Sequence, residues 1–159
     1  MGNLSIQNHS IGRWEISVLA VEGATAIAAF PIMGTIVNSV PGPRTGNQRL
    51  AEWKIAIAVA TKTARGPSRW DPRWMYTITV GFAFHAPTHG NKPSDVENFV
   101  KPCMDALAAG LFSLDEIDAR TIKQFNYDDS NFVRLFIQRL PDVPSKEEEG
   151  IALYVSATE

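Results

Sequence analysis

Asp95 and Glu97 are separated by one residue, and Lys101 follows four positions after Glu97. In an extended or turning backbone, residues i and i+2 project to the same side, so the two carboxylates can share a cation. Oxygen ligands without a neighbouring histidine or cysteine favour Mg²⁺, and Mn²⁺ can replace it. A bound ion would activate water for attack on a phosphodiester, and the Lys101 ammonium would stabilise the charge that develops there. The three residues therefore indicate metal-dependent phosphodiester hydrolysis.

The same residues also have a purely structural interpretation. Ser94 and Glu97 fit a capping box, in which Glu97 only satisfies a backbone N–H at the start of a helix. Asp95 in a first helical turn is favoured by the helix dipole alone. Pro102 argues against this interpretation, because a helix that begins or kinks near Asn98 leaves Asp95 and Glu97 on non-helical backbone. Spacing alone leaves both interpretations open.

A metal site of this kind needs a further acid from elsewhere in the chain. The segment that follows the next predicted helix offers Asp115, Glu116 and Asp118. The alternative for this cluster is a solvated acidic turn with no ligand.

The sequence around these residues resembles the RusA family of Holliday-junction resolvases. The family's signature has two acids around one residue, then Asn, Lys and Asp-Ala-Leu, followed by a Gly-containing turn, an acidic pair and a strand. The resemblance rests on the motif Asp95-x-Glu97-Asn98-x-x-Lys101-Pro102-x-x-Asp105-Ala106-Leu107. The resemblance is strongest over residues 75–140. It implies a single domain over residues 1–159, in which residues 1–23 and 141–159 are additions to the family's fold.

The resemblance implies a homodimer that cleaves phosphodiesters at Holliday junctions or related branched DNA with Mg²⁺ or Mn²⁺. It implies that Asp95, Glu97 and Asp118 ligate the metal and that Lys101 is catalytic beside them. Asp118 is preferred as the third acid because residues 119–122 continue as the family's next strand, and Asp115 is the second choice for this ligand.

Two alternative functions remain open. The family usually has Asp where this chain has Glu97, and this difference is compatible with a non-catalytic branched-DNA-binding or assembly module of the same fold. The other alternative is an endonuclease for other branched or flap structures.

The chain carries a formal net charge of −2, but its charges are unevenly distributed. Between residues 40 and 92, basic residues greatly outnumber the acids Glu52 and Asp71, whereas acids predominate after residue 93. A local cationic patch is what phosphate contacts require, although clustered surface charge without a ligand is the alternative. The predicted DNA-binding residues of this segment are Arg44, Arg49, Lys54, Lys62 and Arg65.

The periodicity of apolar residues predicts the elements that position these groups. Residues 14–20 and 24–32 are predicted to form a hairpin, and residues 48–64 a helix. A strand over 75–86 leads through a loop into a second helix that ends near residue 109. Residues 119–127 and 131–140 are predicted to form a second hairpin, and a linker over 141–150 leads to an edge strand over 151–157. This order predicts an α+β fold in which two helices pack on a mixed sheet of four to six strands.

The composition excludes several classes of protein. No apolar stretch is long enough to cross a bilayer, and the N-terminus lacks the features of a signal peptide, so a cytoplasmic protein without a membrane partner is expected. Cys103 is the single cysteine, which excludes an intramolecular disulfide and a cysteine-based zinc site.

Overall fold

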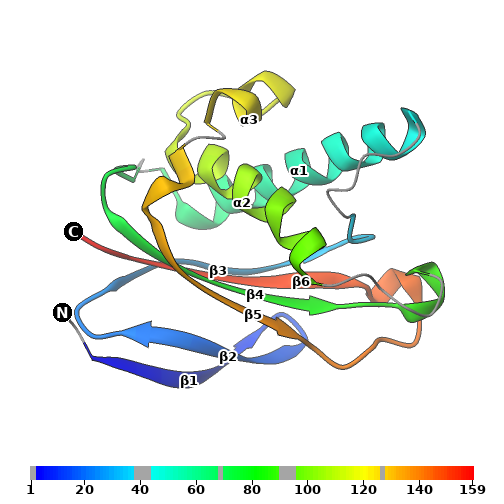
Figure 1. Ribbon diagram of the computed structural model, residues 1–159, viewed down its shortest axis with the longest axis horizontal. Coiled ribbons are helices and arrows are strands. Elements are labelled where there is room, and N and C mark those ends of the chain that lie inside the picture. Colours follow the sequence, from blue (N-terminus) through cyan, green and yellow to red (C-terminus); the bar gives the residue numbers. More distant parts are fainter. Residues whose placement is uncertain (1–2, 38–43, 68–69, 90–95, 126–127) are drawn as a thin grey trace.

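A computed structural model describes residues 3–37, 44–67, 70–89, 96–125 and 128–159, without the side chains of 44–47 and 128. It has an α+β fold in which a four-stranded sheet carries helices on one face and a two-stranded sheet on the other (Figure 1). The elements in chain order are β1 (Leu4–Ile11), β2 (Trp14–Val21), β3 (Thr25–Met33), α1 (Arg44–Arg65), β4 (Met75–Ala83), η1 (Ala86–His89), α2 (Glu97–Phe112), α3 (Ala119–Phe125), η2 (Asp128–Asn131), β5 (Phe132–Arg139), η3 (Lys146–Glu148) and β6 (Gly150–Thr158). The predicted fold class is confirmed.

The larger sheet has the strand order β3-β6-β4-β5 and is mixed. β6 pairs antiparallel with β3 and with β4, while β4 and β5 are parallel. The prediction that residues 151–157 form an edge strand is therefore wrong, because β6 lies between two neighbours. Its side chains are buried along nearly the whole strand, since the helices cover one face and the smaller sheet covers the other. A nearly continuous apolar run is typical of a strand buried on both faces.

α1, α2 and α3 lie on one face of this sheet (Figure 1). The helices predicted over 48–64 and up to 109 are confirmed as α1 and α2, and the strand predicted over 75–86 is confirmed as β4. α1 and α2 approach each other closely at Gly110, where a Cβ atom would stand only 2.7 Å from the carbonyl oxygen of Ala58. Glycine therefore permits the contact that holds α2 in place. No helix within the described parts of the chain is long and apolar enough to cross a membrane.

β1 and β2 form an antiparallel hairpin on the opposite face of the larger sheet. The predicted hairpin of residues 14–20 with 24–32 is wrong, because β2 pairs with β1 whereas β3 pairs with β6. Trp14, Ile16 and Val18 are buried in a second hydrophobic cluster, together with Leu140 and Ala152 from the larger sheet. This alternation of inward side chains anchors β2 to the sheet.

The predicted hairpin of residues 119–127 with 131–140 is wrong in its first half. Residues 119–125 form the helix α3, and only the second half is a strand, β5, which pairs with β4. The sequence of α3, ARTIKQF, contains the helix formers Ala, Arg, Lys and Gln. Asp118 and Thr121 supply the hydrogen bonds that begin a helix at this position.

Candidate functional site

Glu97, Lys101 and Asp105 share one face of α2, because successive members of this set are one helical turn apart. α2 begins at Glu97, behind Val96, so the expectation that Glu97 lies on non-helical backbone is wrong. The capping-box register is not observed either, since it would make Glu97 the third residue of the helix. Pro102 lies within α2 and is buried. The side chains of Glu97 and Lys101 are exposed at the start of the helix.

Asp105 is a nearly buried carboxylate that two lysines approach from opposite sides. Lys54 Nζ of α1 lies 3.3 Å from its Oδ2, and Lys101 Nζ lies 3.7 Å from its Oδ1. The Asp105 side chain is 9% exposed, whereas that of Lys101 is 71% exposed. Asp105 therefore joins α1 to α2 and orients Lys101, while the outer part of that lysine stays accessible to a ligand.

Glu97 and Lys101 line a cavity of about 320 Å³ that also contains the side chain of Asp129. Asp129 belongs to η2, the short turn that leads directly into β5. We call this the α2–η2 cavity, and its lining residues are Glu97, Val100, Lys101, Met104, Asp105, Asp129, Leu135 and Ile137. The cavity thus combines acidic groups with one exposed ammonium over an apolar floor.

Asp129 is a carboxylate on the same cavity as Glu97 and Lys101 that is not among the predicted site residues. The resemblance implies an acidic pair followed by a strand, for which the sequence alone favours Asp118 and then Asp115. In the structure a helix follows Asp118, whereas Asp128-Asp129 stands directly before the strand β5. The repeated aspartate ahead of a strand is the signal that points to Asp129, although the sequence also fits a hairpin with residues 128–130 at its tip.

Asp118 is engaged as the N-cap of α3. Its Oδ1 accepts hydrogen bonds from the backbone N–H of Thr121, at 2.9 Å, and from the Thr121 hydroxyl, at 3.1 Å. These hydrogen bonds lower the pKa of the Asp118 carboxyl from its ordinary value. Asp115 is exposed, and neither acid is among the described residues that line the α2–η2 cavity. The structure therefore does not bring Asp115 or Asp118 to Glu97.

The described residues alone do not complete a metal site. No three His, Cys, Asp or Glu side chains within the described ranges lie close enough together to hold one ion. Asp95, the first acid of the sequence motif, lies outside the described residues. Glu97 and Asp129 are the carboxylates that the α2–η2 cavity offers in addition to Asp105, which already pairs with two lysines.

The predicted DNA-binding residues differ in their surroundings. Arg49 is exposed on α1, and the partly exposed Lys62 donates hydrogen bonds to the backbone carbonyls of Leu114 and Asp115. The side chain of Arg44 lies outside what the structure describes.

Arg65 does not fit the predicted DNA-binding set. It is buried, and its guanidinium donates to Leu111 O at 3.0 Å and to Ser113 O at 2.6 Å. The guanidinium therefore caps the C-terminus of α2, and it is not exposed for a phosphate contact.

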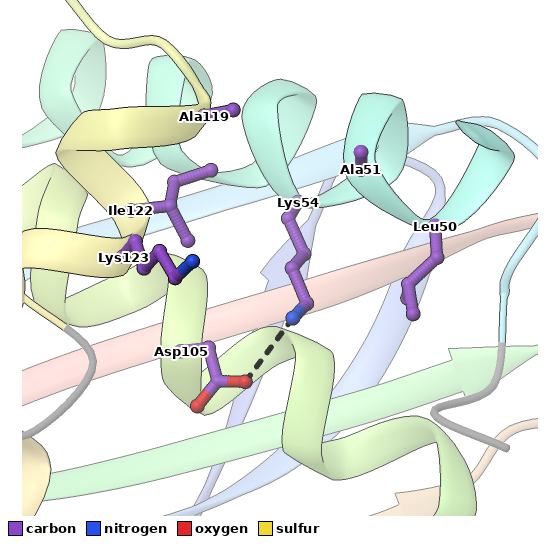
Figure 2. A pocket seen from close by; sticks show the side chains of 7 residues that line it. All are labelled: Leu50, Ala51, Lys54, Asp105, Ala119, Ile122 and Lys123. Carbon is purple, nitrogen blue, oxygen red and sulfur yellow. Dashed lines mark hydrogen bonds and ion pairs between the residues drawn. The ribbon is translucent and has the colours of Figure 1, made fainter. Parts of the chain in front are cut away.

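A second cavity, of about 340 Å³, lies between α1, α2 and α3. Figure 2 shows Lys54 pointing to Asp105 across this cavity, with Lys123 of α3 beside them. The apolar part of the wall comes from Leu50, Ala51, Ala119 and Ile122. Asp105 lines this cavity and the α2–η2 cavity, so its carboxylate lies between the acidic site and the basic side chains of α1 and α3.

Comparison with known proteins gives no match: no family model, curated protein or solved structure corresponds to this chain. The function must therefore be argued from the residues and their geometry.

Proposed function

We propose that this protein is a Mg²⁺-dependent endonuclease that cleaves phosphodiesters at four-way junctions or related branched DNA. The observation that carries the proposal is the α2–η2 cavity, in which Glu97 and Lys101 of the RusA-like motif meet Asp129. The resemblance implies an acidic pair followed by a strand, and in the structure Asp129 precedes the strand β5. The chemistry and the motif thus point to the same surface of the molecule.

The donor set of this surface fits a hard divalent cation. Glu97 and Asp129 supply carboxylate oxygens, and Asp95 stands two residues before Glu97 in the sequence. Among the described residues, no histidine or cysteine lines the cavity, which favours Mg²⁺ or Mn²⁺ over Zn²⁺. When bound, the ion would offset phosphate charge and lower the pKa of a coordinated water.

Lys101 contributes positive charge at the rim of the same cavity. Asp105 lies 3.7 Å from the ammonium on the buried side of the cavity, so its carboxylate favours positions of the exposed lysine that face the cavity. An ammonium in this position stabilises the negative charge that develops on a phosphate oxygen during attack. Asp105 is a positioning residue in this arrangement, because it acts through Lys101.

The DNA duplex would contact the basic side chains of α1. Lys54 and Lys62 are two helical turns apart on one face of this helix, and Arg49 is exposed near its start. Contacts of this kind recognise backbone shape and position the substrate without reading bases. Paired incisions across a four-way junction call for a homodimer, and a cytoplasmic location belongs to the same proposal.

Cleavage of a synthetic four-way junction tests the proposal directly. We expect the wild-type chain to cut the junction with Mg²⁺ or Mn²⁺ and not with EDTA. Asp95→Asn and Glu97→Gln should each lower the rate on the order of a hundredfold, because removing a ligand weakens the site. Asp142→Asn is the control, since Asp142 forms only a surface ion pair with Arg139. Full activity of the Glu97→Gln enzyme would contradict the site.

The alternative function is a branched-DNA-binding or assembly module without catalysis. It is favoured by the lack of a three-acid group within the described ranges and by Glu97 in place of the family's usual Asp. The same experiment separates the two functions, because a module would retain the junction in a gel-shift assay and leave it uncut with either metal. A flap substrate in parallel distinguishes a junction enzyme from one for other branched structures.

A further inference from the structure

β1 is the outer strand of the two-stranded sheet, and the hydrogen bonds of the hairpin fix which way its backbone points. Asn3 O accepts from Glu22 N, so Asn3 and Glu22 form a hydrogen-bonded pair just before β1. Hydrogen-bonded and non-hydrogen-bonded pairs alternate along an antiparallel ladder. The odd-numbered residues of β1 therefore bond to β2, and the even-numbered ones direct their N–H and C=O groups to the free edge. The residues on that edge are Leu4, Ile6, Asn8 and Ser10.

The opposite edge of the hairpin, along β2, is closed by side chains of the larger sheet. Ser17 N donates to Gln138 Oε1 at 3.2 Å, and Gln138 Nε2 donates to Ser17 O at 2.6 Å. Leu19 N donates to Thr79 Oγ1 at 3.4 Å. No corresponding side-chain partner covers the backbone edge of β1 among the described residues.

The two edges of the larger sheet carry features that discourage pairing with another strand. β3 contains Pro31, which has no N–H to donate, and its register shifts between Ala26 and Ala28. β5 carries the charged residues Arg134 and Arg139. β1, with the sequence LSIQNHSI, has eight residues and contains no proline, no lysine, arginine, aspartate or glutamate, and no register shift. Its one ionisable residue, His9, contacts the Tyr154 ring of the larger sheet. Among the described strands, β1 is the edge without protection against pairing.

The side chains of β1 add apolar surface beside this edge. Ile16 and Val18 of β2 point into the core between the hairpin and the larger sheet, so Leu19, which alternates with them, points to the outer face. Ile6 stands opposite Leu19 and therefore lies on that outer face as well. Leu4 and Ile6 are 53% and 55% exposed, the highest values among the large apolar side chains of the described strands. A strand added along β1 would bury both side chains as well as pair the backbone.

We propose that β1 pairs antiparallel with β1 of a second copy of this chain, joining two hairpins into one four-stranded sheet across a two-fold axis. A second copy fits because an antiparallel edge is complementary to itself and an uncharged strand does not repel its own copy. The edge has no charged group that would select a different sequence. The homodimer also belongs to the proposed function, but the pairing of β1 is inferred from the strand edge. A monomer that cleaves junctions would therefore overturn the β1 pairing and leave the proposed nuclease activity standing.

Sedimentation equilibrium on the full chain tests the pairing. Over about 5 to 200 µM we expect the mass to rise from 17.5 kDa toward twice that value, because one strand pair is a small interface with a micromolar dissociation constant. Ile6→Lys places a charge on the edge, and Ile6→Pro removes one outward N–H without touching the bonds to β2. Each should weaken association at least tenfold. Val59→Lys, at an exposed valine of α1, is the matched control and should dimerise as wild type does.

Circular dichroism and thermal denaturation show whether each Ile6 variant still folds, which we expect because the Ile6 side chain is 55% exposed and its outward N–H has no partner among the described residues. A monomeric wild-type chain at about 200 µM overturns the inference. A folded Ile6→Lys or Ile6→Pro variant that dimerises as tightly as wild type also overturns it, because the interface then lies elsewhere.

Discussion

Asp118 and Asp129 are both aspartates that follow α2, but their contacts give them different roles. Asp118 accepts hydrogen bonds from the backbone and the hydroxyl of Thr121, which accounts for its lowered pKa and for the start of α3. Asp129 instead lines the α2–η2 cavity with Glu97 and Lys101. The sequence places Asp118 nearer to the motif, whereas the fold places Asp129 on the same cavity.

Substituting these two aspartates separates a ligand from a helix cap. Asp129→Asn should lower the single-turnover rate of junction cleavage on the order of a hundredfold, because an amide is a poor ligand for Mg²⁺. Asp118→Asn should stay within about threefold of wild type, since asparagine is as good an N-cap as aspartate. The rates are measured at saturating Mg²⁺ and saturating junction. If Asp118→Asn were the more damaging change, the third acid would be Asp118 and our assignment of Asp129 would be wrong.

At the scale of elements, a single buried carboxylate joins four segments of the fold. Glu149, between η3 and β6, is fully buried. Its oxygens accept hydrogen bonds from Ile36 N at 2.8 Å and His85 N at 2.7 Å, and His89 Nε2 lies 2.9 Å from Oε1. These partners come from the segment after β3, the end of β4 and the turn η1. The loops at this end of the sheet therefore depend on one side chain.

Glu149→Ala should destabilise the protein by about 3 kcal/mol, because it leaves the buried N–H of Ile36, the partly buried N–H of His85 and the His89 ring without their acceptor. Its neighbour Glu148 is the matched control. Glu148 forms an ion pair with Arg13 in which both side chains are partly exposed, so Glu148→Ala should cost less than about 1 kcal/mol. Urea denaturation of both variants gives the comparison. Equal stability of the two variants would show that the buried contacts of Glu149 contribute little.

The sequence predicted the elements with strong periodicity and failed where position depends on distant partners. β4 alternates large and small residues, and its strand was recognised, as were α1 and α2. The acidic segment of residues 147–149 does not reveal that Glu149 is buried while Glu148 is not, because that difference depends on Ile36 and His85. β6 was expected at an edge because it comes last in the chain, although its apolar run already indicated burial on both faces.

The same reasoning applies to the candidate site. Glu97 and Lys101 could be predicted, because both belong to one short motif and one face of a helix. Asp129 could not be selected by spacing, because α3 separates it from the motif in the sequence and only the packing of η2 against α2 brings it close. Arg65 was chosen for its charge, whereas the ends of α1 and α2 meet and bury it as a cap.

At the scale of the whole molecule, the basic residues proposed to contact DNA and the acids of the α2–η2 cavity lie on different elements. Arg49, Lys54 and Lys62 lie on α1, whereas Glu97 and Asp129 line the cavity of α2 and η2. The net charge of −2 conceals this arrangement. The lysines and arginines of α1 would attract DNA. The acidic cavity would repel the DNA phosphates unless a metal ion offsets the negative charge of the carboxylates. Binding and cleavage should therefore respond to different substitutions.

Arg49 and Lys101 make this separation measurable. Arg49 is exposed on α1, so Arg49→Ala should weaken junction binding and make its salt dependence shallower by about one unit of slope. Lys101 lies at the α2–η2 cavity, and a charge that acts mainly in the transition state contributes little to ground-state binding. Lys101→Ala should therefore bind a junction almost as wild type does in Ca²⁺ and cut it at least tenfold more slowly in Mg²⁺.

The alternative is that Lys101 serves only its 3.7 Å ion pair with Asp105, which at this exposure contributes about 0.3–0.5 kcal/mol to stability. In that case Lys101→Ala would cut saturating junction at the wild-type rate, and the catalytic role of the lysine would be wrong.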